Sequence, residues 1–150
     1  PLHPLVVHGA VVFAPLGACL ATGFALLPRH RWVIKWPLVC TLAVAGLSAL
    51  LATMTGESLL EARPALAEME LVQSHAALGV RARNVIIAMV LVGLLASWRL
   101  PSVSPLRPLD PPRSDGPMER TLVAGTVLLS VAVLILTFQA GHSGAQAVWG

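Results

Sequence analysis

Charged side chains are scarce in this sequence. Only 11% of its 150 residues are Asp, Glu, Lys or Arg, whereas hydrophobic residues make up 56%. A soluble domain carries about a quarter of its residues as charges, so this composition excludes an ordinary globular fold in water. It also excludes a nucleic-acid partner, because the few basic residues are scattered over connections and form no concentrated basic face. We therefore expect a lipid bilayer as the solvent.

Cysteines and the motifs of soluble enzymes are also nearly absent. The two cysteines, Cys19 and Cys40, fall inside apolar stretches, where we expect ordinary packing and no disulfide framework. The chain has no cysteine pair with metal-site spacing, no glycine-rich phosphate loop and no Gly-x-Ser-x-Gly elbow. Because no nucleophile stands beside a visible base, we do not expect a stand-alone enzyme.

Four long apolar stretches fill most of the chain. Each is close to the ~20 residues that a helix needs to cross ~30 Å of hydrocarbon. They cover about residues 5–27, 36–54, 80–98 and 121–140. The stretches predict an all-α fold, a four-transmembrane-helix bundle that forms a single domain over residues 1–150. The first stretch is too long for a signal peptide and has no basic residue before it, so we expect it to remain as a span.

The basic residues predict how this bundle sits in a membrane. Two connections carry most of them: Arg29, Arg31 and Lys35 lie between the first and second stretches, and Arg99, Arg107, Arg113 and Arg120 lie between the third and fourth. The positive-inside bias places both connections in the cytoplasm, so the N- and C-termini are expected on the non-cytoplasmic side of a bacterial inner membrane. The remaining connection, residues 55–73, fits that side because its glutamates outnumber Arg63.

The two longer connections have different character. The segment from Pro101 to Pro117 is rich in proline, which disfavours helix and predicts an extended, solvated tether. In the connection before the third stretch, Pro64 is followed by good helix formers from Ala65 to Gln73. A helix that starts there can run on into the third span, so we expect His75 to lie on a helix.

Three histidines, His8, His75 and His142, border different spans at the predicted outer face. His3 shares that face and His30 lies at the opposite one, and we interpret both as ordinary interfacial residues. Ionisable groups at the borders of membrane spans are costly and tend to mark functional sites. The three histidines are therefore the candidate site.

A b-type haem suits such a site. Two neutral imidazoles from different helices can ligate one iron axially while the porphyrin fills the apolar bundle. Small neighbours, such as Gly9 beside His8 and Gly144 beside His142, leave room for a porphyrin edge. Small residues also simply let membrane helices pack closely, and this alternative stays open.

Arg81 and Arg83 enter the third span from its outer end. A guanidinium there needs an acidic partner, which can be a haem propionate, Glu57 or Glu61, or it can reach out to the lipid headgroups. Helical spacing puts the two arginines about 200° apart, so they cannot both face one partner. We expect one of them to turn inward as part of the cofactor site.

Both ends of the chain carry a motif. The first is His3-Pro-Leu-Val-Val-His8 and the last is Gly141-His-Ser-Gly-Ala-Gln-Ala-Val-Trp-Gly150. Between them lie Thr55-Gly56-Glu57 and His75. With these motifs, essentially the whole chain resembles the bacterial four-helix membrane family called domain of unknown function 2231. Its members usually open with His-Pro-x-x-Val-His-Phe-Pro and close with Gly-x-x-Gly-Gly-x-x-Val-Tyr. Here Gly9 and Ala10 replace Phe-Pro, Ala145 replaces the second Gly, and Trp149 replaces Tyr. Some members look fused to Rieske iron–sulfur or cytochrome c domains, so the resemblance implies electron transfer outside the cytoplasmic membrane.

Three functional hypotheses follow. The leading one is a membrane-embedded b-type cytochrome subunit that transfers electrons between a quinone or another membrane partner and a periplasmic carrier. Two of His8, His75 and His142 would hold its haem iron, with His75 favoured as one of them. The alternative is a non-redox accessory subunit that packs on a larger respiratory or photosynthetic membrane complex. A third is handling of zinc or copper ions by histidine together with Glu57.

Overall fold

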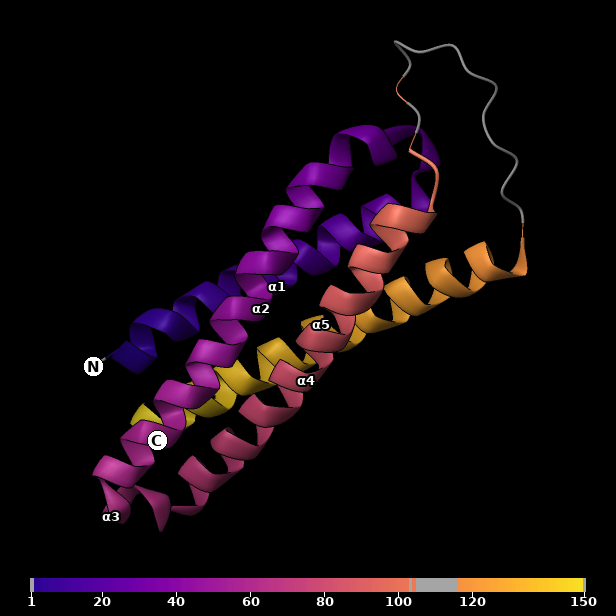
Figure 1. Ribbon diagram of the computed structural model, residues 1–150. Coiled ribbons are helices and arrows are strands. Elements are labelled where there is room, and N and C mark those ends of the chain that lie inside the picture. The colour runs from indigo at the N-terminus through magenta and orange to yellow at the C-terminus, as the bar shows by residue number, and fades with distance from the viewer. Residues whose placement is uncertain (1, 103, 105–115, 150) are drawn as a thin grey trace.

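Four long helices make up the structure, a computed structural model that describes residues 2–102, 104 and 116–149 (Figure 1). They are α1 (Leu2–Leu26), α2 (Arg31–Ala62), α4 (Glu70–Arg99) and α5 (Pro117–Trp149). A 3-10 helix, η1 (Pro28–His30), joins α1 to α2, and the short helix α3 (Pro64–Ala67) lies between α2 and α4. Each long helix is long and apolar enough to span a membrane, which confirms the four predicted helices.

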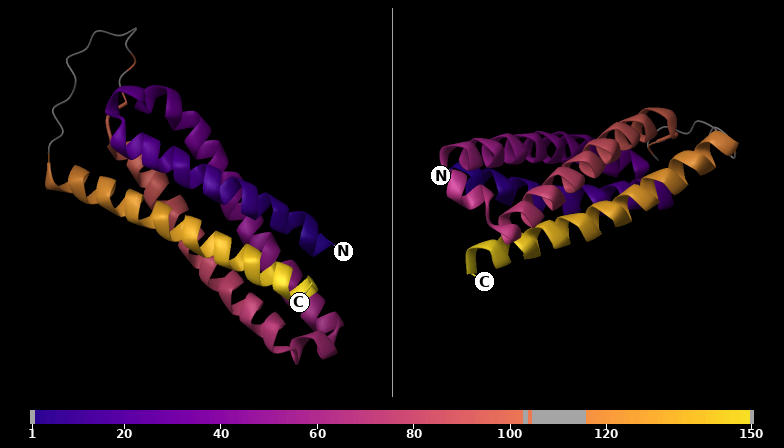
Figure 2. Two further views of the ribbon diagram at one scale, coloured as in Figure 1. Left: turned by 180° about the vertical axis from the view of Figure 1, so that it is seen from behind. Right: turned by 90° about the horizontal axis from the view of Figure 1, so that it is seen from below.

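The four helices form a ring. Helix α1 packs against α2 and α5, and α4 packs against the same two helices, so α1 and α4 lie diagonally across the bundle. Figures 1 and 2 show that both chain termini lie at the same end as α3. We call this end the terminal end, and the opposite end, where η1, Arg99 and Pro117 lie, the η1 end.

The helices are longer than the apolar stretches that predicted them. Helix α2 continues past Met54 to Ala62, and α4 already begins at Glu70. The segment expected as an outer connection, residues 55–73, is therefore mostly helical, which corrects that boundary. Helix α2 ends where a proline follows Arg63, because the residue before proline is pushed out of the helical region. Extended backbone at Met69 separates α3 from α4, and His75 lies on α4 as expected.

Small residues line the contacts between the helices. Ala14, Ala18 and Ala21 lie on one face of α1 and are fully buried, as are Ala45 of α2 and Ala96 of α4. Small side chains let the backbones approach closely, which supplies the dispersion contacts that hold helices together in lipid. Large apolar side chains face outward instead, among them Leu47, Leu91, Trp98, Leu128 and Phe138. The outer surface is thus suited to hydrocarbon.

Cys19 and Cys40 are both free and exposed on the outside of the bundle. They do not contribute to the interior packing that we expected, because each lies on a helix face that no neighbouring helix covers. The predicted tether, Pro101 to Pro117, falls mostly outside the described residues. Its last residue, Pro117, begins α5, a position where a missing N–H costs no intrahelical hydrogen bond.

Replacing Gly93 by leucine should destabilise the bundle. A Cβ atom added at Gly93 would already lie 2.6 Å from Cδ1 of Leu42, a fully buried side chain. We expect Gly93→Leu to lower the free energy of unfolding by about 1–3 kcal/mol, the usual cost of overpacking. The thermal unfolding of detergent-purified protein measures this. Gly79→Leu is the control, since an added Cβ there meets nothing within 4 Å, and equal stability of the two variants would contradict the packing described here.

Candidate functional site

His3 connects the first two helices at the terminal end. Its Nδ1 lies 3.0 Å from the carbonyl oxygen of Ala52 and 3.3 Å from Oγ1 of Thr55 on α2. A carbonyl oxygen can only accept, so Nδ1 of His3 carries the proton. Gly56 makes room for the ring, because a Cβ added there would lie 3.1 Å from Cε1 of His3.

His75 connects α4 to α5 in the same manner. Its Nδ1 lies 3.1 Å from Oγ of Ser143, and the Ser143 hydroxyl donates its own hydrogen to the carbonyl of Ala140. The serine oxygen therefore accepts from His75, and Nδ1 of His75 is again the protonated nitrogen. Gly144 provides the space, since an added Cβ would lie 2.9 Å from Cε1 of the ring.

These two histidines form one polar layer, which we call the histidine layer: His3, Thr55, His75 and Ser143. Both histidines lie at the terminal end of the bundle, His3 on α1 bonded to α2 and His75 on α4 bonded to α5. In both rings the hydrogen bond at Nδ1 leaves the Nε2 lone pair available in the neutral form, which is the tautomer that ligates metals. The layer thus places two potential nitrogen ligands, from α1 and α4, at the terminal end.

His8 and His142 lie outside this layer. Both are exposed. His8 donates from Nδ1 to the carbonyl of Pro4 on its own helix at 2.6 Å. The His142 ring stacks on Phe138, with the ring centroids 6.3 Å apart and the planes within 3°. No three His, Cys, Asp or Glu side chains among the described residues form a group that could hold a metal ion. Sequence reasoning had treated His3 as interfacial, and the structure places it in the histidine layer with His75.

Arg81 and Arg83, the two arginines of the third span, have different surroundings, as their helical spacing requires. Arg83 turns toward α2: its Nη1 lies 3.5 Å from Oγ1 of Thr53, while Nε and Nη2 donate to Oδ1 of Asn84. Arg81 is exposed. The described contacts of Arg83 are thus with neutral oxygens of Asn84 and Thr53.

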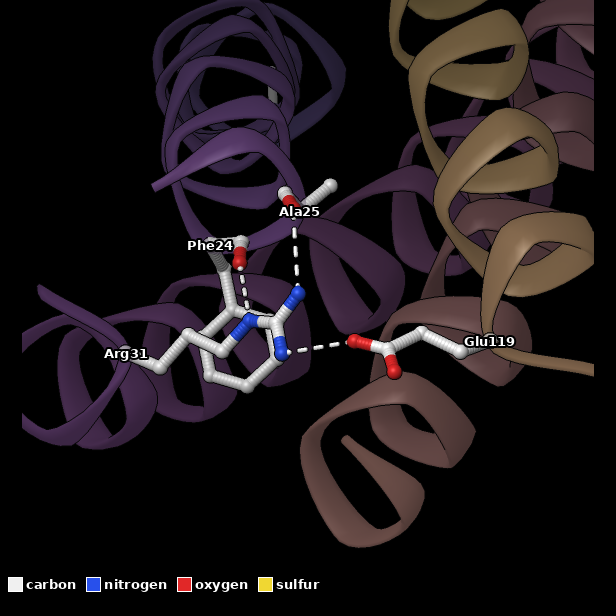
Figure 3. Close-up of polar contacts among 4 residues, drawn as sticks. All are labelled: Phe24, Ala25, Arg31 and Glu119. Carbon is white, nitrogen blue, oxygen red and sulfur yellow. Dashed lines mark hydrogen bonds and ion pairs between the residues drawn. The ribbon is translucent and has the colours of Figure 1, made fainter. Parts of the chain in front are cut away.

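The most completely satisfied charge lies at the η1 end and was not expected from the sequence. Arg31 is only 2% exposed, and its three nitrogens donate to three acceptors (Figure 3). Nε donates to the Phe24 carbonyl at 2.9 Å, Nη2 donates to the Ala25 carbonyl at 3.1 Å, and Nη1 pairs with Oε1 of Glu119 at 3.0 Å. The guanidinium also lies 5.8 Å from the centre of the Phe24 ring, within the range of a cation–π contact.

This arginine caps one helix and ties it to two others. Phe24 and Ala25 lie in the last turn of α1, where carbonyl groups have no intrahelical donor and the helix dipole is negative. Arg31 satisfies both carbonyls from the first residue of α2, and its ion pair reaches the first turn of α5. The sequence showed Arg31 only as one of several basic residues in a connection. The acid just before the fourth span, Glu119, was the available signal for a partner.

Comparison with known protein families matches all of residues 1–150 to the description "Predicted membrane protein (DUF2231)". The chain belongs to the DUF2231 family. This agrees with the resemblance noted in the sequence and with the four helices that can span a membrane. No curated protein and no solved structure matches the chain. The DUF2231 description gives the membrane location and leaves the activity to be argued from the residues.

Removing the Arg31 guanidinium should destabilise the protein strongly. Arg31→Gln removes the guanidinium from Oε1 of Glu119 and leaves the two α1 carbonyls short of donors, and breaking a buried pair in this way costs about 3–5 kcal/mol. Thermal unfolding in detergent measures the loss. Arg29→Gln, an exposed arginine two residues away, is the matched control and should unfold like the wild type.

A double variant separates the two contributions of Arg31. Arg31→Met with Glu119→Leu removes both charges of the ion pair, so stability should recover in part. It should stay below that of the wild type, because the Phe24 and Ala25 carbonyls still lack the donors that Arg31 gave them. If Arg31→Gln unfolds like Arg29→Gln, the capping role is wrong.

Proposed function

We propose that this DUF2231 protein is a membrane-embedded b-type cytochrome subunit, with His75 and His3 as the ligands of one haem. The single observation that carries the proposal is the histidine layer, in which two imidazoles at the same end of the bundle both use Nδ1 as a donor. Bis-histidine haem needs two neutral rings from different helices with free Nε2 atoms, and His3 on α1 and His75 on α4 would supply such a pair of nitrogens.

The chain's own residues orient and tune these ligands. Ser143 and the Ala52 carbonyl hold the two rings through Nδ1, which fixes their rotation and makes Nε2 the more basic nitrogen. When bound, haem supplies reversible one-electron transfer, between a quinone or another membrane partner and a periplasmic carrier. His8 and His142 remain predicted alternative ligands, and Arg81 and Arg83 remain predicted partners of the propionates.

The orientation in the membrane is part of the proposal. The η1 end carries Arg29, Lys35, Arg99 and Arg120, whereas most of the glutamates lie near the terminal end. The positive-inside bias then places the η1 end in the bacterial cytoplasm and the histidine layer near the outer face of the inner membrane. Electrons at that layer are within reach of a periplasmic carrier.

A second candidate function is an accessory subunit without a cofactor. It is favoured by the packing of the two rings. The space that Gly56 leaves is already occupied by the His3 ring, and the space that Gly144 leaves is occupied by the His75 ring. In this interpretation the histidine layer only joins helices, and the exposed apolar surface packs on a larger membrane complex. The two candidates differ in one measurable property, the presence of porphyrin.

The absorption spectrum of the purified protein distinguishes them. Protein from haem-replete cells should show a dithionite-reduced α-band near ~560 nm, the usual region for bis-histidine haem b. His75→Ala and His3→Ala should each abolish the band, because each removes one of the two nitrogens that would hold the iron. His30→Ala, at the η1 end, is the control and should keep it.

Each other outcome has a defined meaning. Wild-type protein without porphyrin overturns the cytochrome proposal, and recovery in a stoichiometric iron-free complex then supports the accessory subunit. A band that survives His75→Ala and His3→Ala but is lost in His8→Ala or His142→Ala assigns the iron to the exposed histidines instead.

Labelling of single cysteines tests the orientation. In a Cys19→Ser, Cys40→Ser background, Ser74→Cys at the terminal end should react with a membrane-impermeant maleimide in cells whose outer membrane alone is permeabilised. Ser102→Cys, beyond the end of α4, should react only after the inner membrane is opened. The reverse pattern would place the histidine layer on the cytoplasmic side, because the two positions lie at opposite ends of the bundle.

A further inference from the structure

A groove of about 630 Å³ opens at the η1 end, between the end of α1 and the start of α5. This volume is in the range of small-molecule sites, about 300–1,000 Å³. The groove is polar at one end, where Arg31, Glu119 and Arg120 line it. The rest of its lining is apolar and includes Leu26, Val123, Val127 and Leu128. The shape and the lining suit a molecule with a polar head and an apolar tail.

The polar end of the groove carries excess positive charge. Glu119 neutralises Arg31 through their ion pair, while the exposed Arg120 adds a further positive charge. A guanidinium donates strong hydrogen bonds to anionic oxygens. Arg31 is only 2% exposed and already donates to Phe24, Ala25 and Glu119 (Figure 3), so the exposed Arg120 is the donor that this groove presents to an anionic oxygen.

The apolar wall continues from this end toward the membrane interior. Arg120 lies in the first turn of α5, and Val123 and Val127 follow on the same face at helical spacing. Leu128 is 70% exposed, so the groove opens toward the surrounding lipid. An acyl chain whose headgroup lies at Arg120 would run along these side chains.

We propose that this groove binds an anionic phospholipid. The phosphate accepts hydrogen bonds from the exposed Arg120 at the η1 end, and one acyl chain lies against Val123 and Val127. Basic pockets between membrane helices are recognised by anionic headgroups in this manner. The excess charge favours an anionic lipid over a zwitterionic one, and the apolar wall favours a lipid over a free phosphate ion.

Lipid titration of the full chain in detergent, followed by native mass spectrometry, tests the site. Phosphatidylglycerol should bind more tightly than phosphatidylcholine. Arg120→Gln should weaken phosphatidylglycerol binding by about fivefold, the effect of one basic residue on an anionic membrane lipid. Ala124→Trp, an exposed position in the lining, should fill the groove and also weaken binding. Arg63→Gln, an exposed arginine at the terminal end, is the matched control and should bind like the wild type.

Three results would overturn the proposal. Equal affinity of Arg120→Gln and Arg63→Gln for phosphatidylglycerol would show that Arg120 does not bind the headgroup. Equal affinity of the wild type for the two lipids would show that the groove has no preference for anionic lipid. Displacement of the lipid by millimolar inorganic phosphate shows that the site recognises a free anion and not a lipid. The measurement needs no haem, so its outcome is separate from that of the cytochrome proposal.

Discussion

A charged side chain that the protein shields from its surroundings has to find its partners within the protein, because a buried charge without partners is costly. Arg31 meets this constraint by collecting the last carbonyls of α1 and the carboxylate of Glu119 around one guanidinium. Breaking any of these contacts would leave a buried polar group without compensation. Arg31 therefore helps to fix the position of α5 relative to α1 and α2. The alanine-lined contacts let the helices approach closely in this arrangement.

The polar contacts between helices concentrate at the two ends of the bundle. In the middle of α5, Ser130 donates to the Thr126 carbonyl of its own helix, as Ser97 in the last turn of α4 does to the Leu94 carbonyl. A hydroxyl that donates to a carbonyl of its own helix has little influence on which neighbouring helix packs against it. The order of the helices is thus specified by small-residue packing along the middle and by side-chain hydrogen bonds at the histidine layer and at Arg31.

The sequence predicted the spans well, because apolar length is a property of one continuous stretch and needs no tertiary information. It did not predict the partners of His3 or Arg31. Both bind backbone carbonyls, which every residue has, and the Ala52 carbonyl is 49 residues away from His3 in the chain. Gly144 was expected to admit a porphyrin edge, and in the structure its missing Cβ admits the His75 ring. The sequence shows that Gly144 leaves space beside its backbone, but it does not show which group occupies that space.

The histidine layer joins the helices in sequential pairs. His3 links α1 to α2, and His75 links α4 to α5, so at the terminal end each contact lies within one half of the chain. Across the halves, a long side-chain hydrogen bond joins Arg83 to Thr53 nearer that end, and the ion pair of Arg31 joins the halves at the other end. Among the described residues, the two histidines thus each tie one hairpin, α1–α2 or α4–α5, while the Arg31–Glu119 ion pair ties the two hairpins together at the η1 end.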